Sequence, residues 1–103
     1  MSQRYRDVLD HEIGARIIVE FTTDGRMIVD YAVVLTVDAA EGEATVRVYD
    51  GAHGVNDMHR HDRRGEKAPA MVFHAGTLGE GMRAAIAAVR TNYKEMIAAW
   101  RAT

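Results

Sequence analysis

Histidines are concentrated in one short segment of the chain. Four of the five lie between His53 and His74, and two of these, His59 and His61, are separated by a single residue. On a β-strand such a pair projects from one face, because successive side chains alternate between the two faces. Two imidazoles on one face can exchange a proton near neutral pH, one acting as base and the other as acid. The spacing therefore indicates acid–base chemistry.

Cations flank this pair in the sequence. We expect Met58 to point into the core with Val46 and Val48, which leaves a polar face made by Arg47, Tyr49, His59, His61 and Arg63. Metal-independent RNA cleavage needs a base for the 2′-hydroxyl, an acid for the leaving oxygen, and cations that hold the developing charge. We assign proton transfer to Tyr49, His59 and His61, and phosphate binding to Arg47, Arg60 and Arg63. The alternative is a basic sheet face that is solvated and has no chemistry.

A metal site is a second interpretation of the same histidines. A His-x-His pair on a strand suits a divalent metal, and His53, Asp57 or His74 could add a third ligand. The sequence does not select among these three, and the chain has no cysteine. We therefore expect no metal and no cofactor.

A third candidate lies near the end of the chain. Helical spacing places the cations of this segment along one line, beside the apolar stripe; they are Arg83, Arg90, Lys94 and Arg101. A stripe of one sign is typical of contact with a phosphate chain or an acidic partner, so we assign Arg83, Arg90 and Lys94 to RNA binding. The alternative is that these long side chains border the buried face and extend into water. Alanines on the back of the helix would permit a homodimer or a heterodimer, although alanine is also the best helix former.

The histidine segment also resembles a known family. Tyr49-Asp50-Gly51-Ala52-His53-Gly54, followed by His59-Arg60-His61, is similar to the central signature of TumE-type small toxins of prokaryotic toxin–antitoxin modules. The match covers residues 46–62. The resemblance implies an early sheet, a C-terminal helix and a ribonuclease toxin neutralised by an antitoxin protein. It is equally compatible with a related non-toxic protein of prophage or defence origin.

The elements that must position these residues are visible in the hydrophobic pattern. Period-2 alternation predicts strands over residues 15–22, 26–37 and 44–50, and shorter strands over 58–63 and 70–74. Thr77-x-x-Glu80 has the form of a capping box, and an apolar stripe then continues to Trp100. We therefore expect an α+β fold, with an antiparallel meander of four or five strands packed by one long C-terminal helix. Residues 4–13 have no clear period, so a short helix and an irregular arm both stay open.

Composition limits the class of protein. With 103 residues the chain forms one domain, residues 1–103, and its net charge of −2 does not indicate a nucleic-acid binder. No apolar run approaches the ~18 residues of a membrane span, and no signal peptide is present, so we expect a cytoplasmic protein without a membrane partner. The favoured hypothesis is a metal-independent endoribonuclease toxin. The alternative is a non-catalytic module that binds a partner protein.

Overall fold

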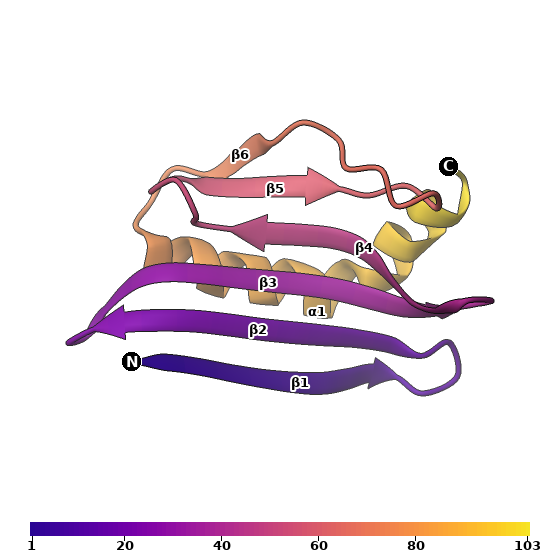
Figure 1. Ribbon diagram of the computed structural model, residues 1–103, viewed down its shortest axis with the longest axis horizontal. Helices are drawn as coiled ribbons and strands as arrows, with labels where there is room; N and C mark the ends of the chain where they lie inside the picture. Colours follow the sequence, from indigo (N-terminus) through magenta and orange to yellow (C-terminus); the bar gives the residue numbers. More distant parts are fainter.

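The computed structural model covers residues 1–103 and consists of one antiparallel sheet with a single helix across one of its faces (Figure 1). The strands pair in chain order; they are β1 (Ser2–Asp10), β2 (Ala15–Asp24), β3 (Met27–Ala39), β4 (Gly42–Asp50), β5 (Asn56–Arg60) and β6 (Met71–His74). The helix, α1 (Leu78–Arg101), ends the fold. The predicted α+β meander is confirmed, with six strands in place of four or five.

The additional strand is β1, which the sequence did not reveal. It pairs with β2 along the edge of the sheet, and most of its residues are exposed. Because this edge strand buries little of either face, its apolar residues do not alternate, and alternation is the signal from which strands are recognised. Both alternatives considered for residues 4–13, a short helix and an irregular arm, are wrong.

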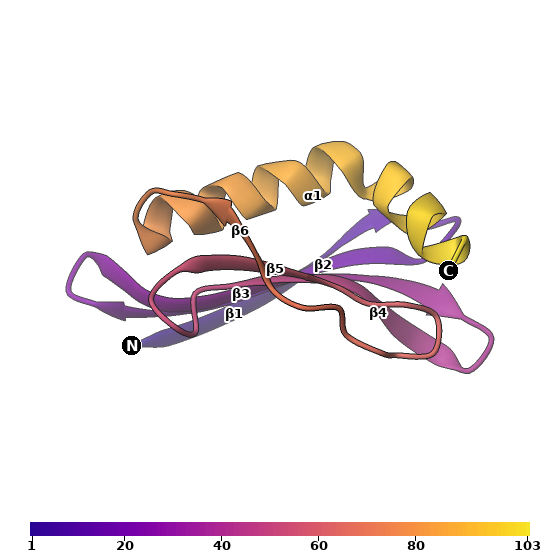
Figure 2. The ribbon, with the colours of Figure 1, turned by 90° about the horizontal axis from the view of Figure 1, so that it is seen from above.

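The core lies between α1 and one face of the sheet. Alternate side chains of β2 and β3 point toward the helix and are fully buried, among them Ile17, Val19, Val33 and Leu35. Seen from above, the helix runs along the sheet on this side only (Figure 2). We call the opposite side the open face, whose centre is the cross-strand row Ile18, Val34 and Val48. The strands therefore separate a packed side from a side that no element of the chain covers.

The helix begins where the sequence predicts. The Thr77 hydroxyl accepts a hydrogen bond from the Glu80 amide at 3.2 Å, and the Glu80 carboxylate accepts one from the Thr77 amide at 2.9 Å. These hydrogen bonds lower the pKa of Glu80, and they satisfy amides that a helix end leaves without partners. Most of the predicted apolar stripe is buried, including Val89, Ile97 and Trp100. No helix is both long and apolar enough to cross a membrane.

A buried amide joins the start of the helix to the sheet. Asn56 is 1% exposed, and its Nδ2 donates to the main-chain oxygens of His74, Gly76 and Thr77 at 3.0–3.3 Å. Its Oδ1 accepts a hydrogen bond of 2.8 Å from the hydroxyl of Tyr31 on β3. Asn56 therefore connects β3, β5, the end of β6 and the first turn of α1. This amide is the polar centre of an otherwise apolar interface.

Gly81 makes that connection possible through close approach. A Cβ atom at this position would lie 1.9 Å from Asn56 Oδ1, whereas a Cβ at Gly79 would first meet Ile28 at 3.5 Å, an ordinary van der Waals contact. Both glycines are in the first turns of the same helix, so they share the same weak helix propensity. Of these two glycines, only Gly81 is required by packing.

We predict that Gly81→Ala and Gly79→Ala have opposite effects on stability. Gly81→Ala should lower the free energy of unfolding by about 1–3 kcal/mol, the usual cost of overpacking a tight core. Gly79→Ala should leave it unchanged or raise it by up to about 1 kcal/mol through helix propensity. Urea unfolding of the two variants checks this. The same change in the free energy of unfolding for both variants would contradict the assigned role of Asn56.

Candidate functional site

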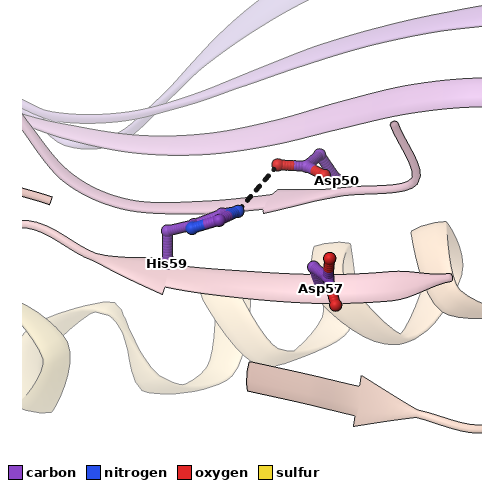
Figure 3. Close-up of side chains that lie close together, drawn as sticks. All are labelled: Asp50, Asp57 and His59. Carbon is purple, nitrogen blue, oxygen red and sulfur yellow. Dashed lines mark ion pairs between the residues drawn. The ribbon is translucent and has the colours of Figure 1, made fainter. Parts of the chain in front are cut away.

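The β4–β5 hairpin brings two carboxylates and an imidazole together on the open face. The antiparallel register pairs Asp50 with Asp57, and Val48 with His59, so these four side chains project from the same side of the sheet. One donor atom from each of Asp50, Asp57 and His59 lies within 4.8 Å of the other two. The close-up shows the His59 ring extending from β5 toward Asp50 on β4 (Figure 3). We refer to these three residues as the carboxylate–histidine cluster.

The cluster is only partly open to solvent. The Nε2 atom of His59 lies 3.3 Å from Oδ2 of Asp50, and the two side chains are 13% and 20% exposed. This separation exceeds the ~2.7–2.9 Å of a charge-assisted hydrogen bond. Asp57 is 8% exposed, and the Nδ1 atom of His59 is buried without a hydrogen-bond partner. The cluster thus holds polar atoms whose bonding is incomplete within the chain.

The cluster contains two carboxylates and no arginine or lysine. Asp50 and Asp57 are direct cross-strand neighbours, a placement in which like charges destabilise a sheet. Neither forms an ion pair with an arginine or a lysine; the ion pairs of the chain that involve arginine lie elsewhere. Burial raises the pKa of Tyr31, and the charges of Asp50 and Asp57 raise it further. The cluster therefore favours a positively charged ligand.

The prediction that Arg47 and Tyr49 of β4 share a face with His59 is wrong. Tyr49 pairs with Met58, points into the core with 4% exposure, and packs edge-on against Phe73 with ring centroids 4.9 Å apart. Arg47 pairs with Arg60, so both lie on the side of Tyr49 and not on the side of His59. The predicted polar face of Arg47, Tyr49, His59, His61 and Arg63 is therefore divided between two sides of the sheet.

A β-bulge in β4 explains why Arg47 and Tyr49 lie on the other face from the one predicted. Thr36 pairs with Thr45 while Leu35 pairs with Arg47, which leaves Val46 as an extra residue in β4. An extra residue shifts the alternation by one position, so Val46 is buried in the core whereas Val48 lies on the open face. The prediction assumed that Val46 and Val48 share a face. The core position expected for Met58 is confirmed.

The other predicted residues around the histidines have separate surroundings. The Arg63 guanidinium donates to the main-chain oxygen of Thr103 at 2.8 and 3.1 Å, and so binds the end of the chain. His61 pairs with Lys67 in an isolated bridge. Burial lowers the pKa of His61, and the charges of Lys67 and His59 lower it further. This lowered pKa favours the uncharged form of the His61 imidazole.

The cation stripe on α1 is interrupted. Arg83, Arg90 and Lys94 are exposed, as predicted, but Arg90 donates to the Asp7 carboxylate of β1 at 2.6 Å. That contact raises the pKa of Arg90. Arg83 and Lys94 form no ion pair. The assignment of these residues to RNA binding stays a prediction.

A hollow of about 510 Å³ lies beside the cluster and is lined by residues of strands β1 to β4. Asp50 lines it, and its other charged lining residues are Arg4, Glu20 and Asp30. Arg4 is already paired with Glu20 at 2.8 Å. Arg16 pairs with Asp38 at 2.6 Å, and Arg6 with Glu43, so these arginines of the open face are neutralised by carboxylates. The hollow carries no unpaired cation.

Sequence reasoning found His59 and weighed Asp57 as a third metal ligand, but it missed Asp50. The second predicted ligand, His61, is outside the cluster. One feature of the sequence could have pointed to Asp50: it ends the strand predicted over residues 44–50, and a short loop then leads to the next predicted strand. Cross-strand pairing could have been inferred from that hairpin, but its register could not.

We predict a pH-dependent contribution of His61 to stability. Because its pKa is lowered in the folded chain, the unfolded chain binds a proton first as the pH falls below the ordinary value of about 6.5. Stability should therefore fall between pH 7 and 5 by more in the wild type than in His61→Gln. Urea unfolding across this range measures the difference. Parallel pH profiles would contradict the burial of a neutral imidazole.

Comparison with known proteins bears on the family and not on the chemistry of the cluster. No curated protein and no solved structure matches the chain. The resemblance to TumE-type toxins thus stays a hypothesis. One family model, described as a domain of unknown function and designated DUF7718, matches residues 1–103. Because this match spans the whole sequence, the chain belongs to the DUF7718 family.

Proposed function

We propose that this protein acts on RNA as a small endoribonuclease whose proton-transferring residues are His59 and His61. The contact between His59 and Asp50 on the open face supports the proposal. A carboxylate beside an imidazole orients the ring and stabilises its protonated form, which is the arrangement that general acid–base catalysts use. The neighbouring hollow is lined by Asp50, so a ligand that fills it would lie next to this pair.

The division of roles differs from the sequence-based hypothesis. His59 and His61 keep their roles, and the lowered pKa of His61 suits a base that must be neutral before it accepts a proton. Tyr49 is excluded because its ring is buried in the core. Asp50 takes its place as the partner that orients His59.

The arginines predicted to bind phosphate do not lie beside His59. Arg47 and Arg60 lie on the far side of the β4–β5 pair from His59, and Arg63 is occupied by Thr103. The helix covers one side of the sheet (Figure 2) and His59 projects from the other side, so the cations of the helix do not lie beside His59. A metal-independent reaction at His59 therefore lacks fixed positive charge, and we expect it to be slow.

A non-catalytic binding module is the second candidate, and the open face itself favours it. Arginines of this face are paired with carboxylates, and half-buried Val34 and Val48 occupy the middle. An apolar centre with a polar rim is typical of a protein–protein interface. The partner would be an antitoxin protein or a second copy of this chain.

Cleavage of single-stranded RNA, measured in EDTA and again with Mn²⁺, tests the proposal. Wild-type protein should cut RNA, and its expression should slow bacterial growth. His59→Gln and Asp50→Asn should each lose at least about 10²-fold in rate, the usual share of a general acid or base. His11→Gln, an exposed histidine in the β1–β2 turn, is the matched control and should be as active as wild type.

The outcomes separate the two candidates. Activity in wild type and in His11→Gln that is lost in His59→Gln supports the endoribonuclease. RNA left intact by the wild type under both conditions, or full activity in His59→Gln, overturns the endoribonuclease proposal and favours the binding module.

A further inference from the structure

We infer that Asp50, Asp57 and His59 form a binding site for one divalent transition-metal cation of the Mn²⁺ or Zn²⁺ type. The inference concerns the ion alone and does not require RNA to be the substrate. It is carried by the spacing of the donor atoms, by the burial of Asp57 and by the charge of the cluster.

The donor atoms have the spacing of metal ligands. Ligand atoms that each lie about 2.1 Å from one ion are roughly 3.0–3.4 Å from their neighbours in octahedral and tetrahedral sites. The His59 Nε2 to Asp50 Oδ2 distance of 3.3 Å falls in this range. All three donors lie within 4.8 Å of one another, so the third ligand needs only a short approach to reach the same range. The hairpin register holds two ligands in place and the third nearby.

Asp57 supplies an independent observation. It is 8% exposed, forms no ion pair, and lies beside His59, whose Nδ1 is buried without a hydrogen-bond partner. A carboxylate with so little exposure has few partners for its oxygens, and a bound cation would add one. Its side chain faces Asp50 and His59, which are the only ligating groups grouped with it. A cation bound between them provides the missing partner.

The charge of the site selects a cation, and its donor types select the kind of cation. Two cross-strand carboxylates carry two negative charges, and no arginine or lysine pairs with either. Carboxylate oxygens suit Mn²⁺ and Mg²⁺, while imidazole favours transition metals such as Zn²⁺. One nitrogen and two oxygens together favour Mn²⁺ or Zn²⁺ over Mg²⁺ or Ca²⁺. Three protein ligands leave coordination positions for water or for a substrate oxygen.

Asn56 makes the site rigid enough to bind. It precedes Asp57 in β5, and its amide bonds to the main-chain oxygens of His74, Gly76 and Thr77 fix that end of the strand. A site built on strands with fixed register loses little flexibility when an ion enters.

The test is a titration of metal-free, untagged full-length protein with Mn²⁺, followed by the electron paramagnetic resonance signal of the free ion. Wild type should bind one equivalent. Asp57→Asn and His59→Gln should weaken binding by at least about 10-fold, since each removes one of three ligands. Asp30→Asn, which removes an exposed carboxylate from the same face, is the matched control and should bind like wild type.

Thermal unfolding provides a second measurement that a structural role would not reproduce. Mn²⁺ should raise the Tm of wild type and of Asp30→Asn, because a ligand that binds only the folded state stabilises it. Without metal, Asp57→Asn should be at least as stable as wild type, since it removes a buried like charge, yet its Tm should not respond to Mn²⁺. The same variant thus keeps the fold and loses the ion.

The inference would be overturned if wild type bound no Mn²⁺ or if Asp57→Asn bound Mn²⁺ as tightly as wild type. It would also be overturned if Asp30→Asn lost as much Mn²⁺ affinity as Asp57→Asn, because the ion would then be attracted only diffusely to the acidic surface. These outcomes are distinct from those of the RNA assay. RNA cleavage in EDTA by a chain that binds no Mn²⁺ removes the metal site and leaves the proposed function. Stoichiometric Mn²⁺ binding by a chain that does not cleave RNA supports the metal site and overturns the proposed function.

Discussion

The structure depends on one buried amide. Asn56 hydrogen-bonds to Tyr31 on β3 and to three main-chain oxygens between the end of β6 and the start of α1. The same residue begins β5, directly before Asp57, so the contacts that hold the helix to the sheet also fix the strand that carries the cluster. A buried polar group of this kind is costly if any partner is lost, which makes the packing around it specific. Stability and the geometry of the site therefore share one set of hydrogen bonds.

The helix and the central strands could be predicted because each carries a strong local signal. Thr77 and Glu80 define a capping box, and β2 and β3 alternate over long stretches. β1 could not be predicted, because an edge strand that buries little of either face shows no alternation.

The site was only half predictable. The His59 position followed from the pattern, whereas the opposite placement of Tyr49 and Arg47 follows from a bulge at Val46 that no residue type marks. Asp50 was missed because its importance depends on the register that pairs it with Asp57.

The two sides of the sheet have different roles. The side facing α1 contains the large apolar side chains and the aromatic pair Tyr49–Phe73, and it accounts for the fold. The open face retains features that stability does not explain: opposed carboxylates at Asp50 and Asp57, and a histidine with a buried nitrogen that lacks a partner. Unfavourable arrangements that persist on an otherwise well-packed scaffold are characteristic of functional sites. This contrast is the physical basis for locating function at the cluster and not on the helix.

The most direct measurement of this claim is the anomalous scattering of Mn²⁺ in crystals of the full chain grown or soaked with the ion. The account predicts one strong anomalous peak on the open face, about 2.0–2.3 Å from donor atoms of Asp50, Asp57 and His59. A cluster that stays empty while the ion occupies exposed histidines such as His53 would contradict the central claim.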